Sequence, residues 1–131
     1  MANVLILFSH SLTKEQTEDL KRMGVNEFIF MPSDLKEKWS GVPPSLESLK
    51  DYAEEFISWI KENSKEGDYL IIQGDYGLTA ILVDFAFRNN LIPIYSTTER
   101  IHREVKLPDG SVRMEKLFKH KIFRRYEKWE E

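Results

Sequence analysis

Three short polar segments contain most of the side chains in this sequence that could bind or react with a small ligand. They are Ser9-His10-Ser11, Gln73-Gly74-Asp75-Tyr76-Gly77 and Ser96-Thr97-Thr98-Glu99-Arg100. Together they supply hydroxyl groups, an imidazole, an amide, a guanidinium and backbone N–H groups next to glycines. Hydrogen-bond donors and positive charge, with few carboxylates beside them, suit a ligand that carries phosphate.

Each segment also has a simpler structural explanation. The serines of the first segment can cap a turn, and His10 would be an ordinary surface histidine in most proteins. Gln73-Gly74 can allow close packing of a helix on a strand, and the two threonines can bond to their own backbone. Arg100 can pair with Glu99 or Glu104. Any one segment favours the structural explanation, whereas three of them at one place in the fold favour a ligand site.

The stretch from Asp68 to Arg100 predicts how two of these segments come together. Tyr69–Ile72 is a short apolar run, typical of a strand buried on both faces. Leu78–Phe87 is apolar nearly all round, which predicts a covered helix, and Leu91–Tyr95 predicts the next strand. Such a βαβ unit has parallel strands and a right-handed crossover. The two polar segments should therefore meet at the carboxyl edge of the sheet, where open α/β sheets bind ligands.

The rest of the chain extends this unit into a larger sheet. The order of predicted elements, β-α-β-α-β-α-β, is typical of an α/β protein with a mostly parallel, Rossmann-like sheet flanked by helices. The remaining predicted elements are strands at Val4–Phe8 and Glu27–Met31, a helix that begins with a capping box of Thr13 and Gln16, a short helix through Trp39, and a helix from Ser45 to about Asn63.

A β-hairpin extension is predicted near the end of the chain. Glu104–Leu107 and Val112–Met114 flank Pro108-Asp109-Gly110, which is a strong hairpin turn signal. Beyond it, Leu117–Tyr126 either extends the second strand or forms a basic terminal segment. The alternation of side-chain types in this run supports a strand.

Charge divides the chain at about the same point. Residues 1–99 contain 9 lysines and arginines against 16 acidic residues, whereas residues 100–131 contain 10 against 6. This asymmetry favours an anionic partner near the hairpin, although a solvated basic hairpin that balances an acidic body explains it as well. We predict a single domain over residues 1–131, with a Rossmann-like core at 1–100 and a basic hairpin or tail at 101–131.

Composition excludes several classes of protein. The chain has 131 residues, no cysteine and no apolar run that could cross a bilayer. Its first residues lack the features of a signal peptide, so we expect a cytoplasmic protein. Neither GxGxxG nor a Walker-type phosphate loop is present, and His10, His102 and His120 lack metal-ligand spacing. We therefore predict no cofactor and no bound metal.

Four segments of the sequence resemble a known family. They are FSHSLT, DYLIIQGDYGLTAILVDF, IPIYSTTER and FKHKIFRRY. With them, the chain from Val4 to Tyr126 resembles the small Csx-class proteins of type III CRISPR systems, and QGDYG with YSTTER is the most specific part. These proteins are similar to CARF domains, which are Rossmann-like dimers that bind cyclic oligoadenylate second messengers. Several stand-alone members are ring nucleases that degrade cyclic tetra-adenylate.

The resemblance implies a homodimer that binds a cyclic oligoadenylate, with cyclic tetra-adenylate as the expected ring, and cleaves it without a metal. Cleavage would switch off the antiviral signal. The substrate's own ribose 2′-OH would attack the adjacent phosphorus and leave a 2′,3′-cyclic phosphate, and the protein would align that hydroxyl and stabilise the charge. We expect no membrane partner and no DNA partner.

Residue type and predicted position suggest a role in binding or cleavage for each candidate residue. The substrate would be positioned by Ser9, Gln73 and either Thr97 or Thr98. Arg100 would stabilise charge, and either His10 or His120 would protonate the leaving oxygen, although a positioned arginine or lysine could serve without a histidine. Tyr76 could stack on adenine. The predicted ligand-binding residues are Ser11, Gln73, Gly74, Asp75, Tyr76, Gly77, Ser96, Thr97 and Thr98.

Two other functions stay open. The protein could be a non-catalytic sensor or sponge for the same messenger, or a generic nucleotide- or RNA-binding module that uses the basic C-terminal strand. A stand-alone sensor needs an effector domain, for which we expect no room in 131 residues. This favours degradation over signalling, but a sponge needs no effector either.

Overall fold

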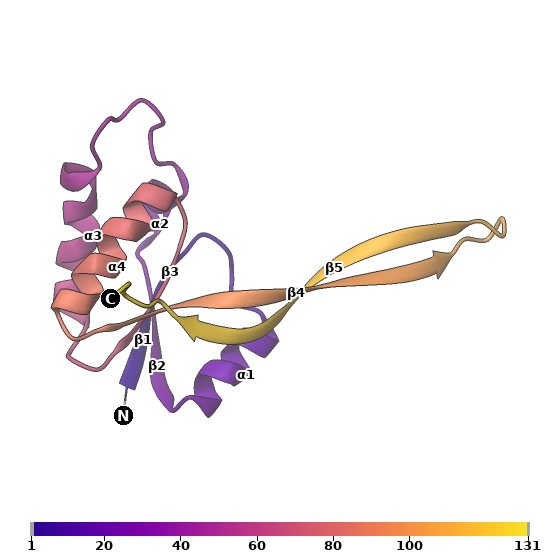
Figure 1. Cartoon of the computed structure of the whole chain (residues 1–131), viewed down its shortest axis with the longest axis horizontal. Helices are drawn as coiled ribbons and strands as arrows, with labels where there is room; N and C mark the ends of the chain where they lie inside the picture. Colours follow the sequence, from indigo (N-terminus) through magenta and orange to yellow (C-terminus); the bar gives the residue numbers. More distant parts are fainter. Residues whose placement is uncertain (1, 131) are drawn as a thin grey trace.

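The computed structural model describes residues 2–130 and shows an α/β fold with a long hairpin that projects from the body (Figure 1). These residues form four helices and five strands. They are β1 (Ala2–Phe8), α1 (Lys14–Arg22), β2 (Val25–Phe30), α2 (Ser33–Ser40), α3 (Lys50–Asn63), β3 (Tyr69–Gln73), α4 (Tyr76–Arg88), β4 (Ile92–Lys106) and β5 (Val112–Arg125).

All five strands form one sheet in the order β2-β1-β3-β4-β5. The first four strands are parallel, and β5 runs antiparallel to β4. The predicted fold class, a mostly parallel Rossmann-like sheet with helices and a C-terminal hairpin, is confirmed. The order reverses between β1 and β3, because β2 follows β1 on one side while β4 follows β3 on the other. Ligands of open α/β sheets bind at such a switch point.

Helices cover both faces of the sheet, and each strand supplies side chains to both. On one face Leu5, Leu7 and Leu70 pack with apolar residues of α2, α3 and α4, among them Phe56 and Leu82. On the other face the single helix α1 covers a smaller cluster. The parallel strands are thus packed between two layers of helices. The smaller cluster contains Val4, Ile6, Leu20, Val25, Ile71 and Ile94.

One predicted helix start is confirmed and another is wrong. The Thr13 hydroxyl accepts from the Gln16 backbone N–H at 3.2 Å, and the Gln16 side-chain oxygen accepts from the Thr13 N–H at 2.8 Å. This is the predicted capping box. Ser45, in contrast, does not begin α3, which starts at Lys50 without a side-chain cap. The Leu46 N–H donates to the Pro43 carbonyl at 3.4 Å, so this stretch forms a turn ahead of the helix.

The predicted polar loop at Ser96–Arg100 is also wrong. The chain does not turn after Tyr95 but continues as β4 to Lys106, paired with β5 throughout. Polar and charged residues occupy this strand because most of it is exposed on both faces. The division predicted at residue 100 therefore falls inside a strand. The alternative that extended the hairpin through residues 117–126 is confirmed as far as Arg125.

We call Thr98–Lys121 the arm. Its strands reverse at the predicted turn, where Gly110 has φ +85° and the Leu107 N–H donates to the Ser111 carbonyl at 2.9 Å. Past the arm, β5 returns to the body, where the Tyr126 N–H donates to the Pro93 carbonyl at 3.0 Å. The Tyr126 hydroxyl donates to the Ile72 carbonyl, and burial raises the pKa of this phenol. Figure 1 shows the arm extending well beyond the layers of the body.

Candidate functional site

A cavity opens at the carboxyl ends of β1 and β2. Its volume is about 440 Å³, within the range of small-ligand pockets. The rings of Phe8 and Phe30, the imidazole of His10, Ser11 and Lys36 are among the groups that line it. The Phe8 and His10 rings meet edge to face with centroids 5.2 Å apart. The cavity thus combines flat apolar surfaces with a hydroxyl, an imidazole and an ammonium group.

The first predicted segment is therefore at this cavity. Ser9-His10-Ser11 follows β1 directly, at the switch point of the sheet, and both His10 and Ser11 line the cavity. Sequence reasoning missed Phe30 and Lys36, which come from the end of β2 and from α2. The side chain of Phe30 is 58% exposed. The sequence signal for Phe30 was a large apolar residue at the carboxyl end of a predicted strand, where ligands of α/β sheets bind.

The second predicted segment serves the packing of the body. The Gln73 side-chain oxygen accepts from the Ser96 backbone N–H at 2.8 Å, and the Gln73 carbonyl accepts from the Trp39 indole at 3.1 Å. A Cβ on Gly74 would lie 2.8 Å from the Trp39 ring. Glycine is thus required for α2 to approach the end of β3, which is the close packing considered from the sequence.

Two residues of the turn that follows, Asp75 and Gly77, also have structural roles. The Asp75 carboxylate accepts from the Leu78 N–H at 3.0 Å and so caps α4. A negative group already stands at this helix N-terminus, which makes it a poor anion site. A Cβ on Gly77 would come within 3.1 Å of Leu49. Tyr76, by contrast, is almost fully exposed at the same edge and keeps its ring available for stacking.

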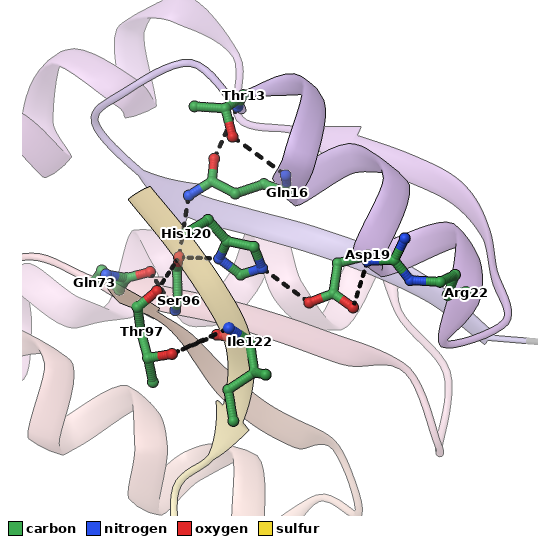
Figure 2. Close-up of polar contacts among 9 residues, drawn as sticks. All are labelled: Thr13, Gln16, Asp19, Arg22, Gln73, Ser96, Thr97, His120 and Ile122. Atoms are coloured by element: carbon green, nitrogen blue, oxygen red, sulfur yellow. Dashed lines mark hydrogen bonds and ion pairs between the residues drawn. The ribbon is translucent and has the colours of Figure 1, made fainter. Parts of the chain in front are cut away.

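The third segment joins a buried polar network at the base of the arm (Figure 2). The Ser96 hydroxyl lies 2.5 Å from His120 Nδ1 and accepts from the Gln16 amide at 3.2 Å. His120 Nε2 lies 2.8 Å from the Asp19 carboxylate. The His120 side chain is only 4% exposed, and that of Asp19 is 18% exposed. Side chains of α1, β4 and β5 thus converge on one point.

The contact with Asp19 defines one proton position in this network. A carboxylate only accepts, so His120 Nε2 carries the hydrogen donated to Asp19. His120 Nδ1 and the Ser96 hydroxyl share the second hydrogen bond. Serine, histidine and aspartate here follow the order of a hydrolytic triad, but the hydroxyl is almost enclosed, with Gln16 bonded to it as well. The network therefore joins β4, β5 and α1 as a structural lock.

The remaining predicted residues lie on the arm or at its base. The Thr97 hydroxyl donates to the Ile122 carbonyl and accepts from the Ile122 N–H, both at 3.1 Å, where the β4–β5 register shifts. Thr98 faces His120 in the ladder. Arg100 sits over the Phe118 ring at 5.4 Å, while Glu99 lies 3.8 Å from Lys121. Arg100 is thus carried outward on the arm and is not among the residues that line the cavity.

Two members of the lock, Gln16 and Asp19, were not predicted as site residues. They stand three positions apart on α1 and so share one side of the helix. Their partners, however, come from strands 80 and 101 residues away in the sequence. Only the path of β5 back along β4 shows the connection. Within residues 2–130, no cluster of three or more potential metal-ligating side chains was found, and no helix is long and apolar enough to cross a membrane.

The fold and this edge define an α/β protein of Rossmann-like topology whose last two strands form an extended hairpin. Within that class, the chain belongs to the uncharacterized protein MJ1673 family, whose model matches residues 2–124. It is 42% identical over 127 residues to the uncharacterized protein MJ1673 of Methanocaldococcus jannaschii, a match that covers 96% of this chain and 98% of that protein. Both strands of the arm lie within the match. No solved structure matches the chain.

Proposed function

We propose that this protein binds a cyclic oligoadenylate at the carboxyl edge of its sheet and cleaves it, as a ring nuclease of type III CRISPR defence. The observation that carries the proposal is the cavity beside the switch point, with Phe8, Phe30, His10 and Lys36 in its lining. The resemblance of QGDYG and YSTTER to the Csx-class proteins supports the same ligand. Cyclic tetra-adenylate is the ring we expect.

The groups of the cavity fit one adenosine phosphate unit. An adenine presents a flat face that stacks on aromatic side chains, and Phe8 and Phe30 offer such faces. Lys36 supplies a point charge for a phosphate, and Ser11 supplies a hydroxyl donor. Tyr76, exposed at the end of β3, can stack on a neighbouring adenine. A ring of identical units has rotational symmetry, which suits two copies of the chain around one ligand.

Cleavage then requires one bond exchange. The ribose 2′-OH gives its proton to solvent water, its oxygen attacks the adjacent phosphorus, and the bond from phosphorus to the 5′-oxygen breaks. A 2′,3′-cyclic phosphate and a 5′-hydroxyl remain. Lys36 offsets the charge on the phosphorane, and His10 gives a proton to the departing 5′-oxygen. His120 was an equal candidate for this role in the sequence. With both ring nitrogens engaged in the lock, it serves the site by positioning β4.

The direct test is an assay in EDTA. The protein is incubated with labelled cyclic oligoadenylates of each ring size, and the products are resolved. We expect linear products that end in a 2′,3′-cyclic phosphate, with cyclic tetra-adenylate cut fastest. Failure to bind any ring would sink the proposal. Tight binding with the ring intact would instead support the sponge.

Lys36→Ala provides a test of location. Loss of one charged contact to phosphate should weaken the affinity for the ring about tenfold, which corresponds to about 1.4 kcal/mol. Lys65→Ala is the matched control, because Lys65 is an exposed lysine ahead of β3, at the opposite edge of the sheet. Binding measured by titration calorimetry should be unchanged in the control. Equal affinities of the two variants would place the ligand elsewhere.

One observation favours a second candidate, an RNA-binding module. Residues 99–121 contain seven lysines and arginines against four acidic residues, together with the exposed ring of Phe118. Basic and aromatic groups together bind single strands. This candidate predicts salt-dependent binding of linear RNA that is lost when arm charges are removed, with Lys36→Ala having no effect.

A further inference from the structure

The arm carries an uncovered apolar face. Partners in an antiparallel ladder share a face, so the side of the arm that carries His120 at its base also carries Phe118, Met114 and Val112. These three side chains are 65%, 57% and 53% exposed. A two-stranded ribbon with nothing packed on its faces is only marginally stable in water. We therefore expect another surface to pack on this exposed face.

Charge on the same face narrows the choice of partner. Arg100 and Lys106 stand opposite Phe118 and Val112, and Lys116 lies between Phe118 and Met114. Glu104, opposite Met114, is the one acidic residue of this face, which therefore has an excess of basic charge. The other face also has an exposed apolar pair, Ile101 and Leu117, but there Arg103 and Arg113 bind Glu115 at 2.8 and 2.7 Å. The excess of basic charge on the face that carries Phe118 disfavours face-to-face packing of two arms, since most of the charges brought together would be alike. A surface that is both apolar and acidic complements this face.

The body of the chain has such a surface. A groove of about 550 Å³ is lined by Leu46, Tyr52 and the carboxylates of Asp51, Glu54 and Glu55. A second hollow adjoins it through Tyr52 and adds Asp34 and Glu37. Lys38, the one basic residue of this lining, is already bound to Glu55 at 2.6 Å. Leu46 is 44% exposed, so the groove also offers apolar contact.

The position of the groove allows exchange between two copies. α2 begins just past the carboxyl end of β2, and α3 runs back toward the start of β3, so the groove opens at the carboxyl edge. The arm continues β4 beyond this same edge and, in Figure 1, projects away from α2 and α3. Its nine paired residues on β4, Thr98–Lys106, span about 30 Å, at about 3.4 Å per residue. An arm of this length can cross to a neighbouring molecule.

We infer that the arm docks into the acidic groove of a second copy of this chain, and that the exchange of two arms makes a closed, two-fold dimer. Each copy gives one arm and receives one, so both arms and both grooves of the dimer are occupied. The carboxyl edges of the two copies then face a common space. In such a dimer, two ligand cavities could share one cyclic ring, and this consequence rests on the proposed function. The docking itself depends only on the arm and the groove.

A charge-swap experiment tests the docking. An arm variant carries Arg100→Glu and Lys116→Glu, and a groove variant carries Asp51→Lys and Glu54→Lys. All four side chains are exposed, so both variants should fold. Light scattering with size exclusion should give a dimer for the wild type and a monomer for each variant alone. A mixture of the two variants should form a dimer again, because both of its arm–groove contacts have opposite charges.

A matched control variant tests whether the effect is specific to the groove. Glu62→Lys with Glu66→Lys makes the same change of charge on the body outside the groove and should leave the dimer intact. A monomeric wild type, variants that stay dimeric, or a mixture that stays monomeric would each overturn the inference. Binding of linear RNA by a monomeric wild type would do so as well. If the wild type is a dimer but does not bind any cyclic oligoadenylate, the proposed function is contradicted and the docking is not.

Discussion

Two histidines at the same edge of the sheet stand in opposite surroundings. His120 is almost buried, with one ring nitrogen on Ser96 and the other on Asp19. His10 is exposed at the cavity, and its ring meets that of Phe8 edge to face. A histidine whose two nitrogens are committed holds strands and helices together, whereas one that faces a cavity can exchange a proton with a ligand. The contrast separates the lock from the proposed active site.

The largest expected effect comes from removing the histidine at the cavity. His10→Ala should slow cleavage of cyclic tetra-adenylate by roughly 10²- to 10⁴-fold, the usual contribution of a positioned proton donor. The melting temperature should stay within the range of neutral surface changes, since His10 packs only at the surface. Single-turnover cleavage and thermal melts measure the two quantities. His102→Ala, on the exposed arm, is the control, and equal rates for the two variants would contradict the role of His10.

Replacing the other histidine, His120, should mainly lower the stability of the fold. His120→Leu removes one hydrogen-bond partner from the Ser96 hydroxyl and one from the Asp19 carboxylate, which keep only the longer contacts to Gln16 at 3.2 Å and to Arg22 at 3.5 Å. We expect the free energy of unfolding to fall by about 2–4 kcal/mol, as measured by urea denaturation. Asp19→Ala should cost a similar amount, and the double variant less than the sum, because both act through one network. Additive effects would argue against the lock.

Most of the fold was predictable because it depends on local pattern. The apolar runs, the Thr13–Gln16 capping box and the turn at Gly110 each specify their own structure. Ser96–Arg100 misled because a polar segment after a buried strand is usually a loop. Here the polar residues continue the strand, since the hairpin leaves the body and exposes both faces. No local pattern distinguishes these two cases.

The candidate site was less predictable, for a physical reason. Residue type identified both histidines but could not separate them, because the partners of His120 lie on α1 and β4. Likewise, Gly74 suggested either a ligand or a helix in close approach, and only the position of Trp39 decides between them. The environment of a side chain depends on contacts distant in the sequence, and those require the path of the whole chain.

A smaller effect tests the structural role of the second segment. Gly74→Ala places a Cβ 2.8 Å from the Trp39 ring, so the free energy of unfolding should fall by about 1–3 kcal/mol. Gly41→Ala is the matched control, because its Cβ would meet its nearest neighbour at an ordinary 3.4 Å. In a Trp39→Phe background the smaller ring should reduce the penalty of the Gly74 change. A Gly74→Ala protein as stable as its control would return this glycine to the list of ligand contacts.

The smallest effect concerns the end of the hairpin. Tyr126→Phe removes the hydrogen bond to the Ile72 carbonyl and should lower the free energy of unfolding by about 1 kcal/mol at neutral pH. Because burial raises the pKa of Tyr126 in the folded protein, the wild type keeps this contribution below about pH 10 and loses it as the pH rises further. The stability difference between the two proteins should therefore shrink above about pH 10. A constant difference would contradict the burial of this hydroxyl.

The histidine ring signals of the protein test the central contrast most directly. The sequence has only three histidines, so a ¹H–¹⁵N spectrum of their rings is simple to assign. A non-cleavable analogue of cyclic tetra-adenylate is titrated into the labelled wild type. We expect the His10 signals to move with saturation while those of His120 keep their positions, since the ligand enters the cavity and leaves the lock closed. Movement of His120 with an unchanged His10 would contradict both assignments.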